Sequence, residues 1–124
     1  MGTNLTSSTR PPNDTVFGQI LRGERRKTFL YEDDRCVAFR DINPVAPVHI
    51  LVIPRKPIPT LNDAEDEDES ILGHLLLVAK KVAKSNGLKN GCRIVINNGP
   101  ASGQTVYHLH VHIIGGRFLS WPPG

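Results

Sequence analysis

Apolar and polar residues change along this chain with two different periods, and each period predicts a type of element. Over residues 15–22 the apolar positions recur every three to four residues, which predicts a short helix that Gly23 ends. Asn13 or Asp14 is the expected N-cap. The same period returns over residues 71–83, preceded by acidic residues and followed by lysines, as the helix dipole favours. The pattern therefore predicts one short leading helix and one main helix.

Five other blocks have the apolar runs or the alternation of β-strands. They cover residues 29–32, 36–39, 49–53, 92–97 and 107–114. The first two flank a polar turn and predict a hairpin, while the third is almost continuously apolar and predicts a buried strand. Strands in meander order, with the main helix inserted among them, predict an α+β domain with an antiparallel sheet of about five strands.

The last predicted strand carries a distinctive row of histidines. His108, His110 and His112 stand at i, i+2 and i+4, with aliphatic residues between them. Successive side chains of a strand point to opposite faces, so this spacing places three imidazoles on one face and the aliphatics on the other. One face is expected to pack and the other to carry chemistry.

Length and composition limit the class of protein. A chain of 124 residues with 39% hydrophobic residues predicts one globular domain, expected over residues 14–124 after a disordered tail at residues 1–13. No apolar run is long enough for a membrane span, and the first residues lack the order of a signal peptide. Cys36 and Cys92 lie in apolar runs and are expected to be buried free thiols, which favours the cytoplasm, or also the nucleus.

The distribution of charge points to an anionic ligand. The net charge is +3, and no Asp or Glu follows Glu69, so the half that carries the histidine row has only basic residues. These basic residues are spread out, which favours a small phosphorylated molecule over a nucleic-acid groove. The acidic run 63–69 is expected to be a solvated helix start rather than a metal or partner site.

Three roles are open to the histidine row. It can be a solvated sheet face, or it can bind a metal ion, because imidazole is a common zinc ligand. The outer α-carbons are about 13 Å apart, so two histidines would chelate, with the third or His49 assisting, and the same half of the chain offers no carboxylate to orient them.

The third role is covalent catalysis. A neutral imidazole already has a free lone pair near pH 7 and needs no general base, provided that its other nitrogen is held as a donor. The loop at residues 99–105, rich in glycine and hydroxyl groups, is suited to hold a phosphate beside the row. The combination favours a histidine nucleophile that acts on a phosphorus centre.

These residues resemble the histidine triad (HIT) family. The family's signature, His-φ-His-φ-His-φ-φ with φ apolar, matches residues 108–114, and the similarity extends over nearly all of residues 14–124. It is strongest to the Hint branch of histidine triad nucleotide-binding proteins. The segments that carry it are residues 39–44, 47–54, 103–107 and the terminal 121–124.

The resemblance implies an activity and an assembly. It implies a hydrolase that cleaves the P–N bond of purine nucleoside 5′-phosphoramidates, an adenosine 5′-monophosphoramidase that releases AMP through a nucleotidyl-histidine intermediate and needs no metal or other cofactor. It also implies a HIT-like fold and a homodimer. Two alternatives stay open: a non-catalytic nucleotide-binding or scaffold protein, and a dinucleoside polyphosphate hydrolase or nucleotidyl transferase of another HIT branch.

The resemblance also assigns roles to residues. It makes His110 the nucleophile, His112 the residue that contacts the phosphate and helps the amine leave, and His108 and His49 the supporting histidines. The remaining matches concern substrate binding: Asp41 and Ile42 at the ribose, Asn97, Gly103, Gln104 and Thr105 at the phosphate, Val16, Phe17, Ile20, Phe39 and Leu51 around the base, and Trp121 near the partner subunit's site.

Four positions depart from the family pattern. Pro57 stands where close relatives often have a histidine, and Arg25-Arg26 replaces an apolar-proline pair. Neither touches the triad, and both are candidates for a shift in substrate preference or in dimer-edge contacts. Thr105 replaces a serine and keeps the hydroxyl group, so we expect function with an altered rate.

Overall fold

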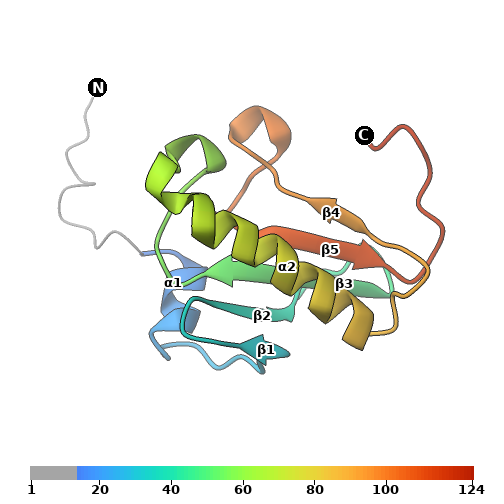
Figure 1. The fold of residues 1–124 in the computed structure, drawn as a ribbon, viewed down its shortest axis with the longest axis horizontal. Helices are drawn as coiled ribbons and strands as arrows, with labels where there is room; N and C mark the ends of the chain where they lie inside the picture. The colour runs from blue at the N-terminus through green and yellow to red at the C-terminus, as the bar shows by residue number, and fades with distance from the viewer. Residues whose placement is uncertain (1–13) are drawn as a thin grey trace.

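A computed structural model describes residues 14–124, so the predicted tail over residues 1–13 lies outside the described residues. Two α-helices and five strands appear in the order α1 (Val16–Leu21), β1 (Tyr31–Glu32), β2 (Cys36–Arg40), β3 (Val48–Pro54), α2 (Glu69–Ser85), β4 (Arg93–Val95) and β5 (Val111–Gly115). The strands form one antiparallel sheet, and α2 lies across it (Figure 1). The predicted α+β fold is therefore confirmed.

The order of the last two strands departs from a simple meander. The sheet order is β1-β2-β3-β5-β4, so β5 lies between β3 and β4. After β3 the chain runs along α2 to the outer strand and then returns to the inner position. This places the histidine segment beside β3, which carries His49.

The two faces of the sheet have separate cores. On one face Ile50, Val52 and Val111 pack against Leu75 and Val78 of α2. On the other face α1 packs against a smaller cluster, which comprises Phe17, Ile20, Val37, Phe39, Leu51 and Ile53. The strand register aligns Phe39, Leu51 and His112 across three neighbouring strands on this second face. The site is therefore built on the α1 face, while α2 stabilises the sheet from behind.

The helix starts differ from the prediction. Thr15, not Asn13 or Asp14, caps α1, and its Oγ1 accepts a hydrogen bond from the N–H of Gly18 at 3.0 Å. The acidic run forms two 3-10 turns, Leu61–Asp63 and Asp66–Asp68, before α2 begins. Most of its side chains are exposed as expected, but Asp68 is buried, and it accepts a hydrogen bond from Lys56 Nζ at 2.6 Å.

Two further predictions need correction. The strand predicted from Tyr107 begins only at Val111, so His108 and His110 precede it in an irregular segment. Of the two cysteines, Cys36 is buried but Cys92 is exposed; both are free thiols. Within residues 14–124 no helix is long and apolar enough to cross a membrane.

Candidate active site

The largest group of predicted site residues meets in one cavity of about 550 Å³ on the α1 face of the sheet. Its lining combines an apolar part from α1, β2 and β3 with a polar part from β5 and the loop before it. The predicted residues that line it are Val16, Phe17, Ile20, Phe39, Asp41, Ile42, Leu51, Asn97, Gly103, Thr105, His110 and His112. Residues that the sequence places far apart thus surround a single space.

His110 is arranged as a nucleophile. Its Nδ1 lies 2.7 Å from the backbone carbonyl oxygen of His108, and a carbonyl oxygen can only accept. Nδ1 therefore carries the hydrogen, which leaves a lone pair on Nε2. Burial lowers the pKa of His110, although the bond to the carbonyl opposes this, so the ring stays neutral at pH 7. Phe17 packs edge-on to the ring, with centroids 5.1 Å apart.

A relay of hydrogen bonds fixes the protonation of His112. The N–H of Val45 donates to His49 Nδ1 at 3.1 Å, so neutral His49 carries its hydrogen on Nε2. His49 Nε2 lies 2.9 Å from His112 Nδ1, which must therefore accept. The hydrogen of His112 is left on Nε2, which is buried without a protein partner. The arrangement gives His112 a free N–H donor.

The electrostatic surroundings keep His112 uncharged. Burial, together with the neighbouring His110 and His49, lowers the pKa of His112 to about 4. Asp41 lies close to this group, since its Oδ2 is 3.3 Å from His49 Nε2. The Asp41 carboxylate also accepts the N–H of Asn43 through Oδ1 at 2.8 Å. At neutral pH His112 is therefore a neutral donor rather than a cation.

His108 does not line the cavity but holds the histidine segment in place. It is almost fully buried, and its Nε2 donates to the carbonyl oxygen of Pro54 at 2.8 Å. Burial lowers the pKa of His108. Since the carbonyl of His108 accepts from His110 Nδ1, this residue orients the nucleophile through its backbone, and its ring anchors the segment to the end of β3.

The loop before the histidines is held by Gln104, which was predicted at the phosphate. Its side chain accepts the N–H of Gly99 at 2.9 Å and donates to the carbonyl oxygens of Pro59 and Val106. Gly103 has φ +93°, a conformation that favours glycine. The buried side chain of Gln104 thus stabilises the loop by hydrogen bonds and does not line the cavity, whereas Gly103 and Thr105 do.

Trp121 lies apart from the cavity in this single chain. Trp121 is 80% exposed, and the guanidinium of Arg93 donates to the carbonyl oxygen of the preceding residue, Ser120, at 2.9 Å. The structure contains no partner chain, so its predicted position near a partner's site remains a prediction.

Sequence reasoning missed several residues of the cavity. Arg25, Arg26 and Lys27 line it, as do Asn43 and Val106. The sequence did mark Arg25-Arg26 as a departure from the family pattern, but not as part of the cavity. Nothing in the local pattern shows that the loop after α1 folds back toward β2.

Asp41, His49 and His112 form a group of potential metal ligands. They bring one potential ligand atom each within 4.8 Å of one another, so a carboxylate from the first half of the chain does reach the histidines. His49 Nδ1 is occupied by the N–H of Val45, and a metal ion at Nε2 would require an imidazolate. The residues therefore fit a hydrogen-bonded relay better than a metal ion.

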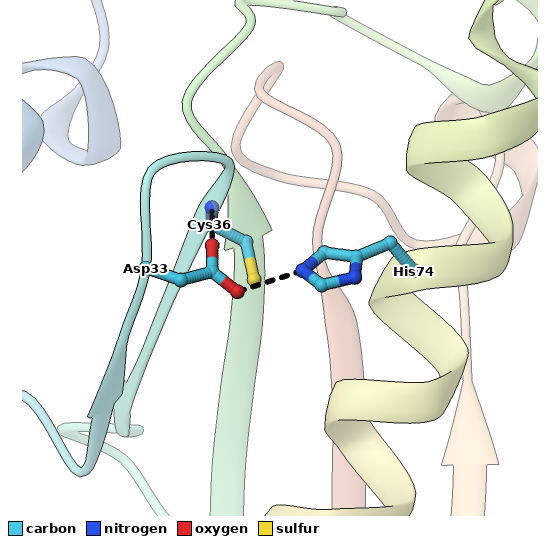
Figure 2. A group of neighbouring side chains, drawn as sticks. All are labelled: Asp33, Cys36 and His74. Carbon is cyan, nitrogen blue, oxygen red and sulfur yellow. Dashed lines mark hydrogen bonds and ion pairs between the residues drawn. The ribbon is translucent and has the colours of Figure 1, made fainter.

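A second group, on the α2 face, consists of Asp33, Cys36 and His74 (Figure 2). Burial alone would raise the pKa of Asp33, but hydrogen bonds from the N–H of Arg35, from His74, from Tyr31 and from the N–H of Cys36 outweigh it and hold that pKa well below its usual range. Burial raises the pKa of the Cys36 thiol to about 12. The Asp33 carboxylate thus has a full set of hydrogen-bond donors, and the Cys36 thiol is unreactive. The group therefore has a structural role, in which Asp33 links the hairpin of β1 and β2 to His74 of α2.

Comparison with known proteins gives a consistent result. The sequence model of the HIT domain matches residues 22–119. A HIT-like protein of Synechococcus elongatus, described as uncharacterized, is 60% identical over 111 residues, which cover 90% of this chain and 97% of that protein.

Solved structures agree. A HIT family hydrolase from Legionella pneumophila superposes with a TM-score of 0.86 at 46% identity, covering 90% of this chain and all of that one. A histidine triad protein from Clostridium difficile has a TM-score of 0.82 at 45% identity, covering 86% and 94%. A histidine triad nucleotide-binding protein from Candida albicans has a TM-score of 0.75 at 30% identity, covering 88% and 83%.

Proposed function

Since this chain belongs to the HIT domain family, we propose that it hydrolyses the P–N bond of purine nucleoside 5′-phosphoramidates through a covalent intermediate on His110. The observation that carries the proposal is the pair of fixed tautomers, a lone pair on His110 Nε2 beside an unpartnered N–H on His112 Nε2. Nucleophile and donor are thus prepared in one cavity before substrate binds.

The substrate would span the cavity from its polar to its apolar part. The phosphoryl group lies at His110 and His112, beside Asn97, Gly103 and Thr105. The ribose hydroxyls reach the Asp41 carboxylate, next to Ile42, and the purine enters the apolar part. That part is formed by Val16, Phe17, Ile20, Phe39 and Leu51.

The reaction proceeds in two displacements. The His110 Nε2 lone pair attacks phosphorus and forms a new P–N bond, while the substrate's P–N bond breaks and its electron pair stays on the departing nitrogen. His112 Nε2–H lies at the leaving group and delivers the proton that the nitrogen needs. Water then attacks phosphorus, the bond between His110 Nε2 and phosphorus breaks with its electron pair returning to Nε2, and AMP leaves. The proton lost by water goes to His112 Nε2, which gave its own proton to the amine. No step requires a metal ion.

The first experiment measures AMP release from adenosine 5′-phosphoramidate after chelator treatment. Wild type should turn over, and His110→Ala should lose at least about 1,000-fold in kcat, because no other lone pair occupies that place. Tyr107→Phe, an exposed neighbour outside the cavity, is the matched control and should keep full activity. Mass spectrometry of quenched wild type should detect a nucleotidyl adduct on His110.

Other outcomes would identify the alternatives. Nucleotide binding without turnover by wild type would favour the scaffold function. Faster cleavage of a dinucleoside polyphosphate than of the phosphoramidate would assign the chain to another HIT branch. Activity that returns only on addition of zinc would overturn the metal-free mechanism.

We further propose that the active form is a cytoplasmic homodimer, as the Hint-like terminal segment suggests. The exposed apolar residues Leu76 and Ile94 lie with Leu88 along one groove, next to the unpaired edge of β4. Light scattering should give twice the mass of one chain. Ile94→Lys should reduce it to one chain mass, whereas Leu77→Lys, exposed but outside that groove, should not.

A further inference from the structure

Three consecutive cationic residues line the cavity near its apolar part, where the purine base is proposed to bind. We call this part the base end. Arg25, Arg26 and Lys27 belong to the loop that follows α1, and Lys27 Nζ lies 5.2 Å from the ring centroid of Phe39. Phe39 is on β2, and β3 separates that strand from β5. Lys27 therefore lies on the side of the cavity away from the strand that carries His112, and Arg25 and Arg26, which also line the cavity, precede it directly in the same loop.

These cations are not needed for the phosphate. In the substrate position proposed above, the phosphoryl group is at His110 and His112, and the purine points toward Phe39. In the part of the chain that the structure describes, none of the three cations forms an ion pair. Apart from Arg25 Nε, which donates to Gln19, their N–H groups are available to the part of a ligand that lies near Phe39.

The guanidinium of Arg25 is held in place at this position. Its Nε donates to Gln19 Oε1 on α1 at 2.6 Å. This bond anchors the planar group to the helix that forms one wall of the cavity, and it leaves the two terminal nitrogens as donors. Arg25 and Arg26 are both exposed at the rim of the cavity.

Arginine and lysine donate hydrogen bonds but accept none. A purine with a carbonyl at position 6 offers two adjacent acceptors on one edge, O6 and N7, which match an arginine fork. Adenine has an amino donor in place of O6, which would face other donors. The side chains of Arg25, Arg26 and Lys27 offer donors only, so this part of the cavity favours a 6-oxopurine over adenine.

We propose that Arg25 and Arg26 make this site selective for 6-oxopurine nucleotides, guanosine and inosine 5′-phosphoryl compounds, over adenosine ones. The inference rests on the proposed function only in one respect: the phosphoryl group lies at His110 and His112, and the purine lies toward Phe39. It refines the purine substrate class and assigns specificity to two residues of the loop that follows α1.

The test measures the affinity of the full-length protein for four nucleoside monophosphates by calorimetry: GMP, IMP, AMP and the 2,6-diaminopurine nucleotide. GMP and IMP should bind about 10-fold more tightly than AMP, the discrimination typical of one bidentate contact. The diaminopurine nucleotide has the 2-amino group of GMP and the 6-amino group of AMP. If the group at position 6 of the purine determines affinity, the diaminopurine nucleotide should bind with the affinity of AMP.

Variants separate hydrogen bonding from charge. Arg25→Met with Arg26→Met should bring the IMP-to-AMP affinity ratio close to one. Lys81→Met, on the exposed face of α2, removes a charge elsewhere and should leave the ratio unchanged. The ratio of kcat/KM for inosine and adenosine phosphoramidates should follow the ratio of affinities.

The outcomes distinguish this inference from the proposed function. Equal affinity for AMP, GMP and IMP, with turnover intact, would overturn the selectivity alone. Selectivity that survives in the double variant would also overturn it. If none of the four nucleotides binds, the nucleotide site itself is refuted, and the selectivity falls with it.

Discussion

At the scale of single residues, the chemistry of the cavity depends on which ring nitrogens carry hydrogen. Backbone groups decide this at three positions: the carbonyl of Pro54 for His108, the carbonyl of His108 for His110, and the N–H of Val45 for His49. His112 is fixed only through His49. The row needs no carboxylate to orient the nucleophile, because backbone atoms take that part.

His49→Asn should impair catalysis through His112. Without the Nε2–H of His49, His112 Nδ1 can carry the hydrogen itself, and the donor facing the substrate is lost. We expect kcat to fall about 10- to 100-fold, the usual effect of losing an orienting partner. Nucleotide affinity should change little.

The kcat of the His49→Asn variant should be measured on phosphoramidates whose leaving amines differ in basicity. Phosphoramidates of strongly basic amines need protonation most, so they should be affected more than those of weakly basic aromatic amines. A uniform loss over both classes would mean that His49 serves only the structure. The wild-type enzyme assayed on the same series is the reference.

At the scale of elements, the two faces of the sheet divide stability from chemistry. The hairpin of β1 and β2 is attached to α2 through Asp33, whose Oδ2 is 2.7 Å from His74 Nε2 and accepts from the Tyr31 hydroxyl at 2.8 Å. Its Oδ1 accepts the N–H groups of Arg35 and Cys36. These contacts lie between the hairpin and α2 (Figure 2), whereas the cavity is lined by α1 on the other face of the sheet.

Asp33→Ala should therefore destabilise the fold without altering the chemistry. We expect the free energy of unfolding to drop by about 2 kcal/mol, as for hydrogen bonds to a charged group, in urea titrations at pH 7. KM and kcat at 15 °C should remain at wild-type values. Asp34→Ala, at the exposed neighbouring position, should lie within about 0.5 kcal/mol of wild type. Loss of activity in folded Asp33→Ala would contradict the separation of the faces.

The element types followed from the sequence more closely than their ends did. The period of 3.6 located both helices, and the apolar runs located all five strands. The start of the last strand was misplaced because alternation continues through residues 108–110, whereas the pairing of β5 begins at Val111, opposite Val52 of β3. Strand limits depend on pairing partners, which local sequence does not reveal.

At the scale of the whole molecule, burying the histidines couples stability to pH. In the unfolded chain a histidine titrates near its ordinary pKa of about 6.5, whereas His112 in the folded protein has a pKa of about 4. Between these values the unfolded state binds the proton and the folded state does not. Folding is therefore penalised as the pH falls from about 6.5 to about 4, and the contribution is zero above that range.

Urea unfolding at pH 7 and at pH 4.5 should reveal this loss. For His112 the shift corresponds to about 3 kcal/mol at most, and His108 and His110 act in the same direction. His112→Asn should lose less stability than wild type over this interval. Equal losses in the two proteins would show that His112 titrates normally when folded.

The sequence by itself determined the alternation of faces, the five strands and two helices, and the histidine row with its family signature, because these depend on local periodicity and on residue type. Only the tertiary structure decided that β5 enters between β3 and β4, that Asp41 and His49 reach His112, and that Arg25 and Arg26 turn toward the base end of the cavity. These are long-range contacts between residues that are distant in the sequence. They are set by strand pairing and by packing on the two faces of the sheet, which no local pattern encodes.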